Sequence, residues 1–254
     1  MYQRALPFVS NRPIFRCIAP LASSFLCLAL SGCGGGGSDI TAATLAAPPV
    51  GSKIEYQITD IDDSRNVISW QLESKVLSSS ADGSYSASFV GNGGNNVVNG
   101  ARYGTVNEVD SYDTRNALVS YSIQGATPVT CTYAAPVPPL PLTSPTGAGW
   151  PDVASHVDCS NGNAFNISRQ EGSRIGVESV TVPAGTFVAN KVQFKRVVTN
   201  LTTLGVRTEQ RTGWYDTVSG RLLQASTDFT YANTKFTSGY LIHELQKLLT
   251  APPT

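Results

Sequence analysis

Apolar and polar residues alternate one by one along most of this chain, and this period of two constrains its fold more than any other feature. In the first clear example, Ile54, Tyr56 and Ile58 alternate with charged and polar residues. Successive side chains of a strand point to opposite faces of a sheet, so the alternation is typical of strands with one buried face. Similar patterns predict strands in segments 68–76, 84–90, 101–109, 117–123, 129–133, 174–182, 186–199, 206–215, 223–231 and 236–242.

The order of these segments predicts an all-β fold in which consecutive strands pair as a curved antiparallel meander. Residues 51–250 suffice for a single β-rich domain. Long strands must curl or be covered to hide one apolar face. We therefore expect a half-barrel or an open barrel. Helical periodicity is scarce, and segment 241–249 is the one candidate for a short helical turn.

A proline-rich segment interrupts the strand pattern between two cysteines. Residues 134–151 contain six prolines, which lack a backbone N–H and are unsuited to the inside of a sheet. Cys131 and Cys159 flank this segment, and in an oxidising compartment such a pair favours a disulfide over metal ligation. The sequence thus predicts a disulfide-closed loop, 131–159, stapled at the surface. A proline-rich recognition segment is the alternative.

The first 32 residues have the layout of a secretory signal. Positive charge at Arg4, Arg12 and Arg16 precedes an apolar run over 17–30, which ends in small residues. This run is shorter than the roughly 20 apolar residues that a spanning helix needs. The composition therefore favours a signal peptide, 1–32, over a retained transmembrane anchor.

The end of this signal, Leu30-Ser31-Gly32-Cys33, resembles the lipobox of bacterial lipoproteins. The resemblance implies cleavage between Gly32 and Cys33 and attachment of lipid to the Cys33 thiol. Several acyl chains on one residue make membrane anchoring stable, because each buried methylene contributes about 0.8 kcal/mol.

The segment after the lipobox predicts the location of the protein. Residues 33–50 are rich in Gly, Ala and Pro and predict a flexible tether. The residue after the lipidated cysteine is Gly34 and not Asp. By the same resemblance to bacterial lipoproteins, a residue other than Asp at this position implies sorting to the outer membrane. We therefore expect a cell-envelope protein that is anchored through lipid and faces the periplasm.

A hairpin motif lies in the C-terminal half. Val182-Pro183-Ala184-Gly185 predicts a type I turn followed by a glycine with positive φ. The surrounding pattern, Glu178-Ser179-Val180-Thr181-Val182-Pro183-Ala184-Gly185-Thr186-Phe187 with Lys191-Val192, Trp214-Tyr215 and Gly220, resembles a group of bacterial envelope proteins. That group is placed near the half-barrel lipoprotein-localisation carriers, in which a curved sheet wraps over a helix or plug. This chain lacks the long amphipathic helices of those carriers.

No catalytic, cofactor or metal constellation stands out in the sequence. His243-Glu244 lacks the second histidine of a zinc-protease helix, and His156 has no ligand cluster near it. Asp60, Asp62 and Asp63 lack the glycine and glutamate of a calcium loop. The sequence has 18 basic and 18 acidic residues, and the basic residues are not clustered in a run. This distribution argues against nucleic-acid binding. The sequence does not decide whether a glycosidase-type pair of carboxylates is present, because the two members of such a pair can be distant in sequence.

These features predict a non-catalytic, lipid-anchored envelope protein that binds an apolar ligand or a protein partner. Tyrosines and tryptophans spread over the strands are candidates to line a binding groove. A structural or assembly factor of the envelope is the alternative, and a hydrolase of envelope polymers is a third hypothesis.

Overall fold

The structure is a computed structural model that describes residues 47–61, 67–91, 96–98, 101–103, 107–233 and 241–249. They lie in one compact unit, Thr41–Thr254. The strands are β1 Lys53–Ile61, β2 Val67–Ser79, β3 Tyr85–Gly91, β4 Asn96–Val98, β5 Ala101–Tyr103, β6 Asn107–Tyr112, β7 Leu118–Ile123, β8 Val129–Val137, β9 Val153–Cys159, β10 Ala164–Val182, β11 Gly185–Asn200, β12 Val206–Asp216, β13 Leu222–Ala232 and β14 Leu241–Leu248. In these ranges the chain forms no helix, and hence none long and apolar enough to cross a membrane. The predicted all-β fold is confirmed.

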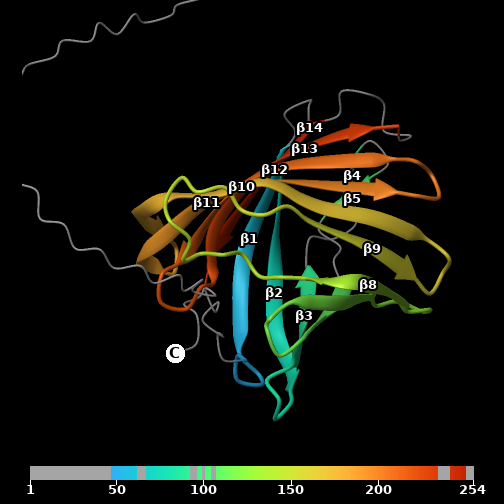
Figure 1. Ribbon diagram of the computed structural model, residues 1–254, viewed down its shortest axis with the longest axis horizontal. Coiled ribbons are helices and arrows are strands. Elements are labelled where there is room, and N and C mark those ends of the chain that lie inside the picture. The colour runs from blue at the N-terminus through green and yellow to red at the C-terminus, as the bar shows by residue number, and fades with distance from the viewer. Residues whose placement is uncertain are drawn as a thin grey trace, which may run out of the picture. The chain divides into compact units, whose positions relative to one another are not determined.

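Twelve strands pair as antiparallel neighbours in one continuous order (Figure 1). That order is β1-β14-β13-β12-β11-β10-β9-β8-β7-β6-β3-β2, while β4 and β5 form a separate hairpin. The predicted curved antiparallel meander is thus confirmed. Since β1 pairs with both β2 and β14, the order also returns to its starting strand. We refer to these twelve strands as the strand ring.

The C-terminal segment was the one place where we expected a helical turn, and that expectation is wrong. Leu241–Leu248 is strand β14, which pairs with β13 on one edge and with β1 on the other. Two partner strands satisfy its backbone donors and acceptors, so the segment has no need of helical hydrogen bonds. Local periodicity could not reveal this pairing, because β1 lies at the opposite end of the domain sequence.

The shortest ladder in the strand ring joins β8 to β9. These strands pair at only three positions, which begin at Cys131 and end at Tyr133. Cys131 and Cys159 form a disulfide at the first of them. Beyond Tyr133, the Ser155 hydroxyl accepts a hydrogen bond from the Ala135 N–H (3.2 Å) and donates one to the Ala135 carbonyl (2.7 Å). One side chain therefore takes over the bridging where the two backbones separate.

The proline-rich segment departs from the prediction in its first residues. β8 continues through Pro136 to Val137, so part of 134–151 does lie in a strand. Proline is tolerated there because β8 no longer pairs directly with β9 beyond Tyr133, and the missing N–H breaks no ladder bond.

The remainder of this segment, residues 138–151, crosses in front of the strand ring in Figure 1 and is anchored on β10. The Trp150 N–H donates to the Gly172 carbonyl (2.7 Å), and the Trp150 ring covers Gly172 so closely that a Cβ there would lie 2.5 Å from the ring. A bulge at Glu171, with φ of +51°, turns Gly172 toward the tryptophan. Trp150 packs with Val192 and Phe194. The loop therefore occupies part of the interior rather than only the surface.

The hairpin motif forms the expected connection between β10 and β11. Val182 pairs with Gly185, which leaves Pro183 and Ala184 in the turn. Gly185 has a φ of +140°, so the predicted glycine with positive φ is confirmed. Beside this hairpin the interior is packed by a buried cluster of Tyr56, Ile58, Trp70, Val180, Val182, Ala189 and Leu223.

Candidate functional site: a cavity lined by arginines

The strand ring encloses a cavity of about 1180 Å³. Ring diameter grows with strand number, and about eight strands already leave an interior that side chains just fill. Twelve strands therefore leave unfilled space unless a plug occupies it. The loop residue Leu140 packs beside Trp150 and also lines the cavity, so the loop fills only part of the interior. The remaining volume exceeds the roughly 300–1,000 Å³ of ordinary small-molecule sites.

Most of the cavity wall is apolar or aromatic. The strands β7 to β13 and the loop supply Leu118, Tyr121, Ile123, Tyr133, Val137, Leu140, Val153, Phe165, Ile167, Phe194, Val198, Val206, Tyr215 and Tyr231. Of the aromatic residues that the sequence offered as groove lining, Tyr121, Tyr215 and Tyr231 line the cavity, whereas Tyr56 and Trp70 belong to the packed cluster. Such a wall suits a hydrocarbon chain.

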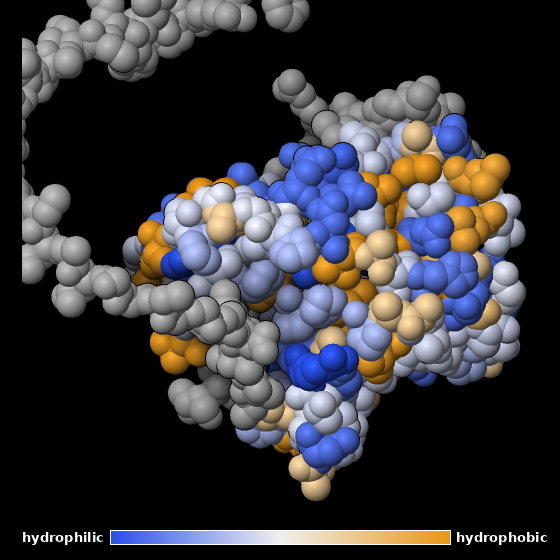
Figure 2. Space-filling model, viewed as in Figure 1, coloured by the Kyte–Doolittle hydropathy of each residue, from blue (hydrophilic) through white to orange (hydrophobic). Residues whose placement is uncertain are grey.

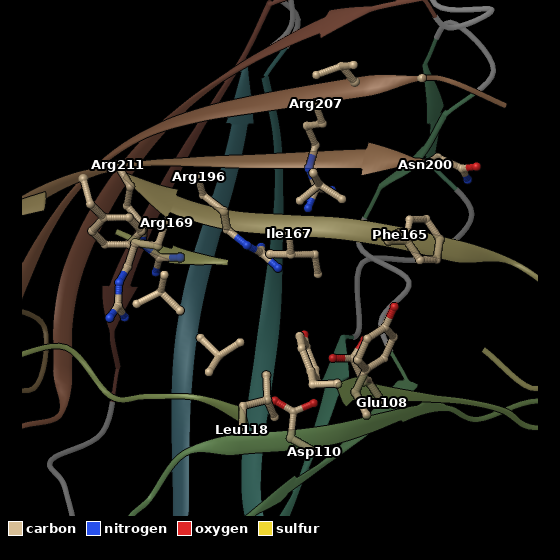
Figure 3. Close-up of a pocket in the computed structure, with 18 of the residues that line it drawn as sticks. Glu108, Asp110, Leu118, Phe165, Ile167, Arg169, Arg196, Asn200, Arg207 and Arg211 are labelled. Carbon is tan, nitrogen blue, oxygen red and sulfur yellow. The ribbon is translucent and has the colours of Figure 1, made fainter. Parts of the chain in front are cut away.

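Four arginines from three adjacent strands also line the cavity, and Figure 3 shows them entering it from the same wall. Arg169 lies on β10, Arg196 on β11, and Arg207 and Arg211 on β12. Glu209 is buried among them, with 4% of its side chain exposed, and forms ion pairs with Arg196 (3.3 Å) and Arg207 (2.7 Å). One carboxylate thus faces two guanidinium groups.

Arg169 and Arg196 stand directly opposite each other on neighbouring strands. Side chains at opposed positions of an antiparallel pair have Cβ atoms only about 4.5–5.5 Å apart, and like charges there are destabilising. The Arg169 Nη1 group donates to the Pro138 carbonyl (3.1 Å), which holds it against the loop. Burial lowers the pKa of Arg169 below its ordinary value.

Two carboxyl groups enter the cavity from another wall, on β6 (Figure 3). Glu108 and Asp110 are two residues apart and therefore share one face of the strand. Burial, together with the hydrogen bond and charge of Glu108, raises the pKa of Asp110 to about 8. The Tyr112 hydroxyl donates to Asp110 Oδ2 (3.0 Å). The raised pKa favours the protonated form of Asp110, and the four arginines outnumber the acids beside them, Glu108, Asp110 and Glu209.

The arginines and the acid pair were not predicted from the sequence, although the alternation contains a signal for the arginines. Arg196 is in phase with the inward-facing Phe194 and Val198, and Arg169 is in phase with Ile167. A charged residue at an apolar position of the alternation points into the interior. That reading requires knowing that the interior is hollow.

The other candidate residues of the sequence lie outside this cavity or outside the described residues. His156 is exposed and hydrogen-bonded to Asn166 (3.1 Å) and Asp158 (3.0 Å), which raise its pKa. The backbone of His243 belongs to β14, and its side chain is not described. Gly32, Cys33, the signal, most of the tether, and Asp62 and Asp63 lie outside the described residues. Across the ranges that are described, no three metal-ligating side chains gather into a cluster.

The comparisons with other proteins concern the fold. No protein-family model matches the sequence, and no curated protein matches it. Solved structures with a similar fold include a proposed lipoprotein from Parabacteroides distasonis (13% identity, 82% of this chain and 97% of that chain, TM-score 0.45). A second is a proposed exported protein with a YmcC-like fold from Bacteroides fragilis (13% identity, 82% of this chain and 98% of that chain, TM-score 0.49). A third is a LolA superfamily protein from Nitrosomonas europaea (9% identity, 84% of this chain and 91% of that chain, TM-score 0.22).

These neighbours are of the kinds that the hairpin motif resembles, namely lipoproteins and a LolA-like protein. With identities of 9–13% and TM-scores below 0.5, the likeness does not extend to a shared function.

Proposed function

We propose that this chain is a lipid-anchored protein of the cell envelope that holds an acyl-chain-bearing ligand inside the strand ring. The observation that carries the proposal is the cavity of about 1180 Å³ with its predominantly apolar and aromatic wall. Each methylene that leaves water for such a wall contributes about 0.8 kcal/mol. A chain of ten carbons would therefore gain several kcal/mol before the entropic costs of binding.

The anchor and the tether support the location in this proposal. The signal 1–32 and the lipobox at Cys33 would place lipid on the N-terminus, and residues 33–50 would act as a flexible spacer. Gly34 favours the outer membrane. A ligand-binding domain tethered in this way would stay within reach of a membrane surface, where acyl-chain ligands are found.

The test is native mass spectrometry of residues 41–254, secreted to the periplasm and purified without detergent. Every strand pair of the strand ring lies within this unit. A lipid-sized adduct is expected on the parent. Val198→Trp, which fills the cavity from β11, should remove the adduct. Val188→Trp is the matched control, because Val188 lies on the same strand with 56% of its surface exposed.

Two results would contradict the proposal. One is a parent protein that retains no adduct and takes up no decanoate on addition. The other is an adduct that survives Val198→Trp as fully as Val188→Trp, because the ligand would then lie outside the cavity.

A protein partner is the second candidate, and exposed apolar residues on the β10–β11 hairpin favour it. Ile175, Val177 and Val188 are 41%, 49% and 56% exposed on neighbouring positions of these two strands. Elsewhere on the face shown in Figure 2, hydrophobic residues lie interspersed with hydrophilic ones. Crosslinking in intact envelopes should yield a specific product that Val188→Glu abolishes; an unchanged product would rule out this surface.

A further inference from the structure

The opposed pair of Arg169 and Arg196 is the feature of the cavity that a purely apolar ligand leaves unexplained. Two guanidinium groups at one cross-strand position repel each other, and the repulsion is stronger in a partly desolvated interior than in water. Arg196 shares Glu209 with Arg207. Arg169 forms no ion pair with any carboxylate of the described residues. Positive charge is therefore in excess at this position.

Unpartnered polar atoms point to the same place. Among the described residues, Arg169 Nε, Arg207 Nε and Asp110 Oδ1 are buried without a hydrogen-bond partner. Buried polar groups in folded proteins are nearly always bonded, so each such atom calls for an explanation. All three belong to side chains that line one cavity, and Figure 3 shows the arginines and Asp110 on facing walls. A ligand head group with several acceptor oxygens beside Arg169 would give its Nε a partner.

We propose that the cavity binds an amphipathic anion, with its hydrocarbon chain along the apolar wall and its phosphate or carboxylate head between Arg169 and Arg196. This inference rests on the proposed function and deepens it by naming the chemical class of the ligand. Guanidinium groups bind both anions through paired, charge-assisted hydrogen bonds. Phe165 and Ile167 precede Arg169 on the same face of β10, so the apolar wall begins next to the charged position.

Glu209 and Arg207 have a positioning role in this arrangement. Glu209 is directly opposite Arg196 on β12, and its carboxylate holds the Arg196 guanidinium from the side away from Arg169. Because Glu209 also pairs with Arg207, it cannot neutralise both arginines. Arg196 therefore stays oriented and retains charge for an incoming anion.

The experiment compares ligands that share one chain and differ only in the head. Decyl phosphate, decanoate, 1-decanol and inorganic phosphate are titrated calorimetrically into residues 41–254 after removal of co-purified lipid by unfolding and refolding. Decyl phosphate and decanoate should bind at least about tenfold more tightly than 1-decanol, which corresponds to about 1.4 kcal/mol. Inorganic phosphate should bind far more weakly than decyl phosphate, because it lacks the chain.

Charge-removing variants locate the head group. Arg169→Gln and Arg196→Gln should each weaken decyl phosphate binding about tenfold or more and leave 1-decanol binding unchanged. Lys195→Gln is the matched control: it removes one positive charge from the neighbouring position of β11, where Lys195 faces outward and pairs with Glu171. Near-ultraviolet circular dichroism checks that each variant keeps the parental fold.

Each remaining outcome overturns a different claim. Equal affinities for decyl phosphate and 1-decanol overturn the anionic class and leave the proposed function standing. Equal affinities for decyl phosphate and inorganic phosphate overturn the amphipathic ligand in favour of a free anion. Binding of none of the four ligands overturns both the inference and the proposed function. Equal losses in Lys195→Gln and Arg196→Gln would move the anion to the outside of the sheet.

Discussion

The two ends of the strand ring are built from the same strands but have different interiors. On β13, Leu223 is fully buried and Tyr231 lines the cavity. One end is filled by a cluster of aliphatic and aromatic side chains, whereas at the other end a smaller buried cluster borders open space that arginines line.

This difference shows how the fold separates stability from binding. Close packing around Leu223 and the hairpin of β10 and β11 stabilises the strand ring at one end. At the other end a smaller buried cluster of Cys131, Tyr133, Val157 and Ile167 holds the ring together with the disulfide and the anchored loop, and part of the interior stays open. Charged residues can be kept there because the structure does not depend on their burial.

The largest expected effect contrasts a leucine from each end. Leu223→Ala should lower the free energy of unfolding by about 2–5 kcal/mol, because it leaves a void in a fully buried cluster. Leu118→Ala removes the same atoms from the cavity wall, where space already exists, and should cost less than half as much. Urea unfolding of both variants measures the contrast. Equal losses would mean that the cavity wall is packed as tightly as the core.

The disulfide is the next largest contribution, and it acts at the seam between β8 and β9. Replacing both Cys131 and Cys159 by Ser should lower the free energy of unfolding by about 3 kcal/mol, because the unfolded chain loses a closed loop. Hydrogen exchange should rise first in β8 and β9, since only three ladder positions join them. A uniform rise across the domain would show that the seam is no weaker than the other ladders.

The buried carboxyl predicts an unusual dependence of stability on pH. The folded protein keeps the Asp110 proton up to about pH 8, whereas the unfolded chain releases it near the ordinary value, so stability should fall as pH rises between these values. Tyr112, Glu108, Arg196 and the neighbouring tyrosines on β3, β7 and β8 surround the group.

Asp110→Asn should remove this slope. At pH 8 we expect it to raise the free energy of unfolding by on the order of a few kcal/mol relative to the parent, with little difference near pH 4. Urea unfolding at both pH values tests this, with Asp152→Asn on the exposed loop as the control. A parent whose stability rises steadily from pH 4 to 8, with Asp110→Asn following it, would contradict the buried, protonated state.

The smallest effect concerns the side-chain bridge at the seam. Ser155→Ala removes the buried hydroxyl that joins β9 to Ala135 of β8 and should cost about 1 kcal/mol, because the Ala135 N–H and carbonyl lose their shared partner. The exposed Ser160 hydroxyl, which accepts from the Thr130 N–H (3.1 Å), is the control. Ser160→Ala should cost less than Ser155→Ala, and the reverse order would place the critical bridge on the other side of the disulfide.

Much of the strand pattern could be predicted, because period-two alternation survives wherever one face is buried. The hairpin at Gly185 was predictable for a local reason, since its turn residues determine the backbone. The strand over residues 153–159 and the start of β10 were missed, because Ser155 and Arg169 interrupt the apolar phase with polar residues that the fold places inside. These interruptions mark the seam and the cavity.

The sequence by itself determined most of the strands, the turn at Gly185, and the features that predict export and a lipid at Cys33. These depend on neighbours within a few residues or on short motifs. Only the tertiary structure decided that β14 closes on β1, that the proline-rich loop fills part of the interior, and that Arg169 faces Arg196. Such features depend on pairings between segments far apart in the chain. The number of strands that pair sets the size of the ring, and this size determines whether inward-facing residues meet a core or a cavity.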